Sequence, residues 1–139
     1  MDLDRVDITK IQIRYDDVDP LGHVNNARFL TYFEIGRLSY MKRYFNIRGA
    51  MDVNIVIARA ELDFERSVMF DDDIFVRTWI SRVGNTSFDF SYTIEDERGR
   101  LFCKGKTVNV FVENGRPTKA PEFLHSLVIK EGNETDRSS

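Results

Sequence analysis

Residues 15–26 form the densest group of polar side chains in the sequence, reading Tyr-Asp-Asp-Val-Asp-Pro-Leu-Gly-His-Val-Asn-Asn. The run contains three carboxylates, one of the chain's two histidines and two amides. A carboxylate beside an electrophilic carbonyl can attack that carbonyl or activate a water molecule. The same residue types also form ordinary turns and helix caps, so the run by itself leaves both catalysis and simple capping open.

The run lies directly before a long amphipathic segment, which places it at the start of a predicted helix. Asn25 or Asn26 can cap that helix. Pro20 restrains Asp19 to an extended conformation, and Gly22 gives the loop its flexibility. Because the first turn of a helix offers unpaired backbone N–H groups and a partial positive charge, it can polarise a carbonyl and hold an oxyanion.

The other polar residues of the run have simpler interpretations beside the catalytic one. Asp16 and Asp17 can be solvated loop charges, and a single histidine such as His23 is more often structural than catalytic. Glu34 and Arg37 are three residues apart on the predicted helix, a spacing that predicts a surface ion pair.

The periodicity of apolar residues predicts one strand, one long helix and then four strands. The first strand is expected over 6–15 and the helix from Asn25 or Asn26 to about Phe45, with an aromatic stripe on one face. Strands are expected near 55–65, 74–83, 87–96 and 101–112, joined as an antiparallel meander. Pro121 starts a short helix that runs to about Val128, and residues 131–139 are expected to be disordered. This order predicts an α+β fold with the helix packed on one face of the sheet.

Length and composition fit a single domain over residues 1–139, with a net charge of -3 and 42% hydrophobic residues. A mildly acidic chain has no electrostatic reason to bind nucleic acid, and no apolar run is long enough to cross a membrane. The charged N-terminus does not resemble a signal peptide. Cys103 is the single cysteine, so a reducing, cytoplasmic location is expected, and a core or interface role suits this residue better than nucleophilic chemistry. We expect no metal ion and no cofactor.

The chain resembles the hydroxybenzoyl-CoA thioesterase-like branch of the hotdog superfamily over residues 6–125. The resemblance is most specific over residues 17–26, Asp-Val-Asp-Pro-Leu-Gly-His-Val-Asn-Asn, and continues in Phe29, Tyr32, Phe33, Glu34 and Arg37. Weaker similarity covers residues 61–64, 84–88 and 105–108. The resemblance implies a single hotdog fold, in which a sheet of about five strands wraps a long central helix. It also implies dimers whose sheets join edge to edge, with active sites at the dimer interface.

The family's functional residues map onto this segment. Asp19 corresponds to the carboxylate that acts as nucleophile or general base, and Asn26 to the residue whose backbone N–H polarises the thioester carbonyl. The run is also similar to plant acyl carrier protein thioesterases, which are double hotdogs; Asp19 and His23 match their motif, but Leu21 stands where they have asparagine. We therefore expect His23 to be a helper that orients the carboxylate or the water. A hotdog hydratase is disfavoured, because the spacing from Asp19 or Asp17 to His23 differs from the hydratase pattern.

Further residues are expected to line the substrate site. Phe29 lies three residues beyond Asn26 and can bound the acyl chain, although the aromatic stripe as a whole is typical of a packed core. The expected substrate-binding residues are Gly22, Val24, Asn25 and Phe29.

The predicted function is hydrolysis of an acyl thioester, most simply an acyl-CoA, to a carboxylic acid and a thiol. Two alternatives stay open: a thioesterase for acyl carrier protein, and a non-catalytic acyl-CoA-binding or assembly protein of the same fold. A homodimer or homotetramer is expected in each case.

Overall fold

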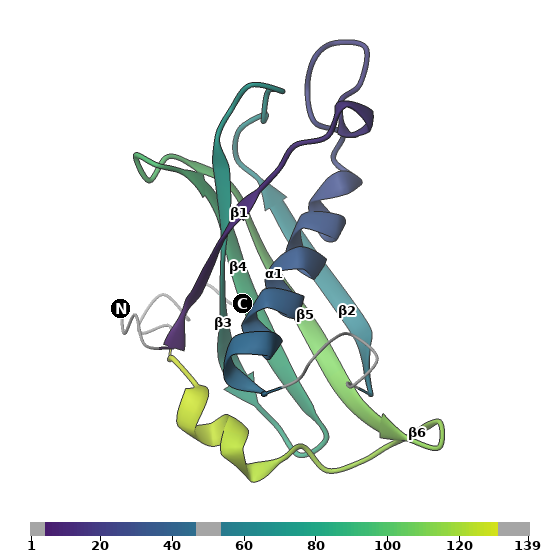
Figure 1. The fold of residues 1–139 in the computed structure, drawn as a ribbon. Helices are drawn as coiled ribbons and strands as arrows, with labels where there is room; N and C mark the ends of the chain where they lie inside the picture. The colour runs from purple at the N-terminus through teal and green to yellow at the C-terminus, as the bar shows by residue number, and fades with distance from the viewer. Residues whose placement is uncertain (1–4, 47–53, 131–139) are drawn as a thin grey trace.

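A computed structural model describes residues 5–46 and 54–130 of the chain. The elements are β1 (Asp7–Ile11), the 3₁₀ turn η2 (Tyr15–Asp17), α1 (Arg28–Tyr44), β2 (Ile55–Phe64), β3 (Ile74–Val83), β4 (Ser87–Asp96), β5 (Leu101–Glu113), β6 (Arg116–Pro117) and the 3₁₀ helix η4 (Glu122–Leu127). Figure 1 shows α1 lying across the sheet, which confirms the predicted α+β class. The predicted disorder of 131–139 falls outside the described residues.

The strands form one antiparallel sheet in the order β1-β3-β4-β5-β2, with the short β6 paired to β5. The predicted four-strand meander is therefore wrong: β3, β4 and β5 follow one another, but β2 pairs with β5 and lies at the far edge. Burial explains this order, because β3 and β4 have many buried positions along their length whereas most of β2 is exposed. Periodicity identifies strands but does not specify which strands are neighbours.

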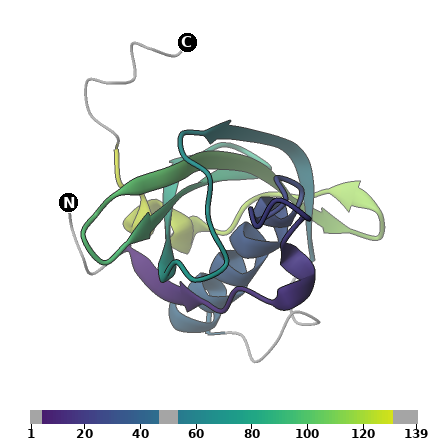
Figure 2. The same cartoon turned by 90° about the horizontal axis from the view of Figure 1, so that it is seen from above.

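The concave face of the sheet wraps around α1, as Figure 2 shows from above. The ring of Phe33 stacks on Tyr92 of β4, with centroids 4.3 Å apart and planes within 7° of parallel. Gly105 of β5 permits this approach, because a Cβ there would collide with the Phe33 ring. Elsewhere on the helix, Gly36 packs directly against Thr78 of β3. The aromatic stripe is thus core, as its spacing indicated.

Several predicted boundaries shift at the start of the domain. The first strand ends at Ile11 instead of residue 15, since residues 15–17 turn into η2. The helix begins at Arg28, after a lead-in turn. The Glu34–Arg37 surface pair is absent from the described contacts, because Arg37 instead donates a hydrogen bond to the hydroxyl of Tyr92 in the core.

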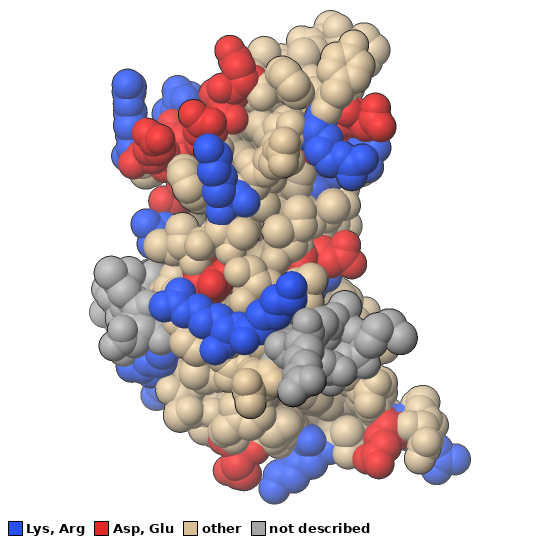
Figure 3. All heavy atoms as spheres, in the orientation of Figure 1, with Lys and Arg blue, Asp and Glu red and all other residues tan. Residues whose placement is uncertain are grey.

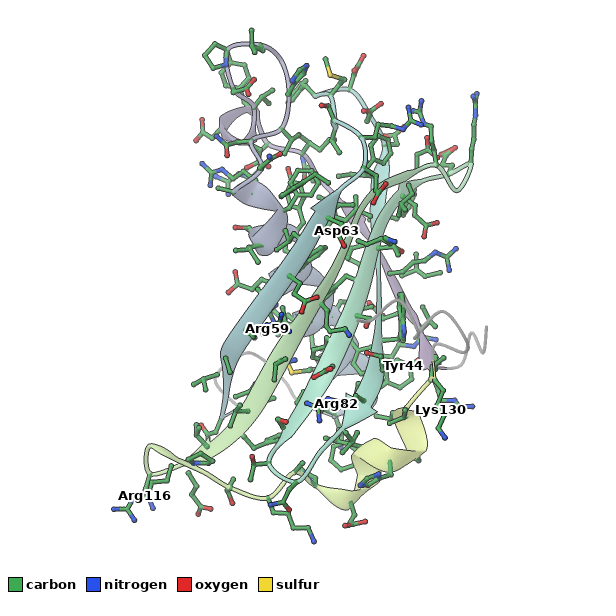
Figure 4. All side chains as sticks on the ribbon, turned by 180° about the vertical axis from the view of Figure 1, so that it is seen from behind. Tyr44, Arg59, Asp63, Arg82, Arg116 and Lys130 are labelled. Atoms are coloured by element: carbon green, nitrogen blue, oxygen red, sulfur yellow. The ribbon has the colours of Figure 1, made fainter. Side chains whose placement is uncertain are left out.

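The surface carries both signs of charge. On the face that bears α1, basic and acidic side chains are interspersed, including at the end of the molecule that carries the loop before α1, where only the tip is uncharged in this view (Figure 3). The opposite face of the sheet, shown in Figure 4, presents Arg59 and Asp63 from β2 and Arg82 from β3. Arg82 pairs there with Asp89 at 2.8 Å. Among the described residues, no helix is both long and apolar enough to cross a membrane.

Candidate active site

The polar run of residues 17–27, called here the Asp19 loop, connects η2 to α1 and lies at one end of the molecule (Figure 1). It folds back on itself like a small hairpin. Val18 pairs with Val24, and the Asn25 N–H donates to the carbonyl of Asp17 at 2.8 Å. Asn25 therefore lies beside Asp17, and the two ends of the loop meet at the start of the helix.

Asp17 fixes this loop to the rest of the fold. Its side chain is buried, with the residue only 6% exposed, so it is not the solvated charge that the sequence allowed. The hydroxyl of Tyr32 donates to its Oδ2 at 2.8 Å, as does the backbone N–H of Arg14 at 2.9 Å. The Arg28 guanidinium lies 3.6 Å from Oδ1. A buried carboxylate needs such partners, and here they join the loop to the first turns of α1.

Asp19 is held by the backbone of its own loop. Its Oδ1 accepts the N–H groups of Leu21 at 3.0 Å and His23 at 3.1 Å, while its own N–H donates to the His23 carbonyl at 2.8 Å. Gly22, with a φ of +86°, makes the turn that aims these donors. Within the described residues Oδ2 of Asp19 has no hydrogen-bond partner, and the residue is half-buried. One oxygen is therefore fixed and the other is available for chemistry.

His23 meets Asp19 through backbone atoms. The residue is half-buried, and its backbone bridges to Met69 in the connection between β2 and β3. The neighbouring Val24 is buried in the core, and its N–H donates to the Val68 carbonyl at 2.8 Å. These contacts dock the Asp19 loop on residues 68–69. The structure thus makes Val24 a packing residue of the loop and leaves His23 adjacent to Asp19.

Asn25 and Asn26 have different roles at the start of the helix. The side-chain Oδ1 of Asn25 accepts the Ala27 N–H at 2.8 Å, and its carbonyl accepts the Arg28 N–H at 2.9 Å. Asn25 thus caps the lead-in turn, although the formal N-cap, Ala27, has no side-chain cap. Among the hydrogen bonds of the described residues, none uses the N–H of Asn26, which is exposed. That N–H is a free donor at the positive end of α1.

Phe29 is almost completely buried, with 1% of its surface exposed. Its ring packs edge to face on Phe64 of β2, with centroids 5.3 Å apart, and lies 5.8 Å from the ring of Tyr32. Phe64 is 46% exposed, so this residue separates Phe29 from solvent. Sequence reasoning placed Phe64 in a weaker stretch of similarity but gave it no role, because nothing in its strand pattern shows that the end of β2 reaches the start of α1.

Tyr32 and Arg28 are the other residues whose role was missed. Both hold Asp17, and their spacing of four places them on one side of the helix. That spacing was a usable signal, since a tyrosine and an arginine facing a preceding acidic loop can bind its carboxylates. Cys103 lies elsewhere, buried in the core on β5; burial raises the pKa of its thiol to about 12, which leaves it neutral and unreactive.

The geometry can act on a carbonyl group. A half-buried carboxylate with one free oxygen and an unpaired N–H at a helix start lie on the same short loop, and the loop is braced at Asp17 and at residues 68–69. A carboxylate can attack or activate water, and a fixed N–H can hold the oxyanion that results. In the described part of the chain, no group of three or more His, Cys, Asp or Glu side chains is arranged to hold a metal ion.

The pattern of the thioesterase-like superfamily matches residues 13–128. The chain belongs to this superfamily. Among solved structures, a thioesterase from Thermus thermophilus complexed with coenzyme A and Zn is 34% identical, with a TM-score of 0.79 over 89% of this chain and 92% of that one. A predicted thioesterase from Bacillus stearothermophilus is 30% identical, with a TM-score of 0.81 over 91% of this chain and 99% of that one.

A curated relative is similar over much of the same region: the Bacillus subtilis protein YsmA is 30% identical over 109 residues, covering 77% of this chain and 74% of that protein. The predicted hotdog thioesterase family and the single hotdog fold are both confirmed by the family and structure matches. In this thioesterase-like chain, the matched residues 13–128 include the whole Asp19 loop, α1 and strands β2 to β5.

Proposed function

We propose that this chain hydrolyses acyl thioesters, and that acyl-CoAs are its substrates. The observation that carries the proposal is the Asp19 loop, in which a carboxylate with one free oxygen and the unpaired Asn26 N–H stand at the start of α1. The superfamily is thioesterase-like, and the similar Thermus thermophilus thioesterase is complexed with coenzyme A. Both facts favour a CoA thioester over other carbonyl compounds.

In the proposed reaction the thioester carbonyl oxygen accepts a hydrogen bond from the Asn26 N–H, which stabilises the negative charge on that oxygen as the carbon becomes tetrahedral. The free Oδ2 of Asp19 either removes a proton from an attacking water or attacks the carbon itself to form an anhydride, which water then hydrolyses. In both routes the C–S bond breaks and CoA leaves as the thiolate. The products are a carboxylic acid and a thiol, and no redox partner is needed.

His23 is proposed as a positioning residue. Its backbone N–H and carbonyl bind the carboxylate and the N–H of Asp19, so the conformation of residue 23 sets the direction of the Asp19 side chain. Gly22 supports the same geometry through its positive φ. The substrate-binding roles expected for Gly22, Val24, Asn25 and Phe29 stay proposals. The half-buried Gly22 and the exposed Asn25 can contact the thioester, whereas the buried Val24 and Phe29 shape the site from beneath.

Turnover is tested by incubating the protein with short, medium, long and aromatic acyl-CoAs and measuring free thiol. Release of thiol from at least one member, lost in the Asp19→Asn variant, is the expected result. Binding of acyl-CoA without thiol release would instead support the non-catalytic binding protein. Release of thiol from acyl carrier protein thioesters but not from CoA thioesters would mean that the substrates are acyl carrier protein thioesters.

We also propose that the chain is at least a dimer, joined through the β2 edges. In the described residues β2 pairs on one side only, with β5, and it exposes Val56 and Ile57. A long open edge with apolar side chains favours pairing with another strand. Sedimentation at micromolar concentration should give a dimer or tetramer, and a monomer would contradict the proposal. A cytoplasmic location is a proposal too, supported by the single cysteine.

A further inference from the structure

Helix α1 leaves part of the concave sheet face uncovered. It packs mainly against β1 and β3, and Phe29 and Phe33 near its start contact Phe64 of β2 and approach Gly105 of β5. A groove of about 440 Å³ remains between residues 34–41 of the helix and the β5–β2 side of the sheet. Most of its lining is apolar: Ile35, Leu38 and Met41 from the helix, Ile55 and Ile57 from β2, and Phe90 from β4. Its volume falls within the roughly 300–1,000 Å³ of small-molecule sites, so the groove can hold a flexible apolar chain.

A guanidinium group is fixed among these apolar residues. Arg37 is half-buried in the groove and donates one hydrogen bond, of 3.2 Å, to the hydroxyl of Tyr92. A guanidinium carries five N–H donors, and within the described residues no other acceptor takes a bond from Arg37. The side chain is therefore anchored at one point and keeps unused donors inside the groove.

Among the described contacts, the polar groups beneath Arg37 bond to one another and do not take up those donors. The Tyr92 hydroxyl also bonds to Thr107 at 2.6 Å, and the Asn109 amide is engaged with the carbonyls of Phe88 and Thr107 at 3.2 and 3.0 Å. Tyr92, Thr107 and Asn109 are buried, and the Asn109 Oδ1 accepts a contact of 3.5 Å from the Thr107 hydroxyl. Glu34 also lines the groove but is exposed and makes no ion pair with Arg37 among the described contacts.

We propose that this groove binds the acyl portion of the thioester substrate, and that Arg37 recognises an oxygen acceptor, carboxylate or hydroxyl, at the far end of that acyl group. The inference rests on the proposed thioesterase function and names its substrate class. The apolar walls accept methylene groups, and the oxygen supplies the acceptor that the Arg37 donors lack. Arg37 lies roughly 14 Å along the helix from its first residue, Arg28, at about 1.5 Å per residue, so it is placed to bind the distal end of the acyl group and not the carbonyl.

Three matched thioesters test the proposal: octanoyl-CoA, ω-hydroxyoctanoyl-CoA and suberyl-CoA. Their kcat/KM values are measured for wild type, Arg37→Met and Glu34→Gln, and their Kd values by calorimetry in the Asp19→Asn background. Wild type should favour at least one oxygen-bearing chain over octanoyl by about tenfold, the effect of one charge-assisted hydrogen bond. In Arg37→Met that ratio should fall to about one while the octanoyl values change by less than about threefold. The better of the two oxygen-bearing chains identifies the acceptor.

Glu34→Gln is the control, because it changes the other ionisable group of the groove and should keep the preference. A wild-type ratio near one, a ratio that Arg37→Met leaves unchanged, or a ratio abolished by Glu34→Gln would each overturn the inference. So would an equal loss for all three thioesters in Arg37→Met, which would make Arg37 a packing residue. Because Kd is measured without turnover, a wild type that binds but does not hydrolyse would refute the proposed function and still test the inference.

Discussion

The hydroxyl of Tyr32 donates a hydrogen bond of 2.8 Å to the carboxylate of Asp17, and through this contact a residue near the start of α1 holds the loop that precedes the helix. Asp17 is buried, while burial of Tyr32 itself, together with this hydrogen bond, raises the pKa of the tyrosine above its usual range. The tyrosine therefore stays a neutral donor, and Asp17 serves as the anchor of a loop whose proposed chemistry belongs to Asp19.

Tyr32→Phe should lower the free energy of unfolding by about 1–3 kcal/mol, because it leaves a buried carboxylate short of one donor. Denaturant unfolding followed by circular dichroism measures the loss. Tyr15→Phe is the matched control, since Tyr15 is 85% exposed and should cost close to nothing. Equal stability of both variants would mean that the Tyr32 contact does not hold the loop.

Asp19→Asn should leave the stability near that of wild type and reduce thiol release by at least about 100-fold, since the amide can neither attack nor accept a proton. Asp16→Asn, a change at an exposed residue just before the same loop, should keep the activity. Asp17→Asn should lower the free energy of unfolding, because it weakens the contacts that hold the loop. Any loss of activity in this variant should follow from that change in the loop and be smaller than the loss in Asp19→Asn. Full activity in Asp19→Asn together with a stable but inactive Asp17→Asn would identify Asp17 as the reacting carboxylate.

The sequence predicted the elements well because each is a strong periodic pattern, and β2 to β5 fall where alternation placed them. It failed on the position of β2, since antiparallel pairing depends on which faces are buried and not on chain order. The resemblance identified Asp19 and Asn26 as candidates, but it could not show that Asp17 is buried, because Tyr32 and Arg28 supply its partners from another element. The contact of Phe29 with Phe64 joins α1 to the far end of β2 and leaves no local signal at all.

Cys103 should be unreactive in the folded protein. Burial, with a smaller contribution from the nearby Asp63 carboxylate, raises the pKa of its thiol from 9.0 to about 12, so thiolate is scarce at ordinary pH. Because the folded thiol holds its proton more tightly than the unfolded one, this contribution to stability is present below about pH 9 and is lost as the pH rises towards 12. A thiol reagent should label the native protein slowly and the denatured protein fully. Fast labelling of the native state would contradict the buried placement.

Substitutions at Phe29 and Phe64 should distinguish an effect on core packing from an effect on the choice of acyl group. Their rings meet edge to face at 5.3 Å, but Phe29 is 1% exposed and Phe64 is 46% exposed. Truncating a buried phenylalanine costs about 3–5 kcal/mol, so Phe29→Ala should lower the unfolding free energy strongly. Phe29→Leu is the milder variant for kinetics, and it should shift preference towards bulkier acyl groups more than it lowers the best rate.

Phe64→Ala should keep most of the stability and shift the chain-length profile in the same direction, because it opens the surface above Phe29 near the start of the helix. Removing apolar contact with a substrate is worth about 1–3 kcal/mol, so the change should appear as a preference and not as an on–off switch. Phe123→Ala is the matched control: Phe123, on η4, is also 46% exposed, and it packs on Phe45 with ring centroids 5.3 Å apart. The same acyl-CoA panel is run on all variants. If Phe64→Ala and Phe123→Ala give the wild-type profile and Phe29→Leu loses only stability, the two rings belong to the core and the acyl chain is bounded elsewhere.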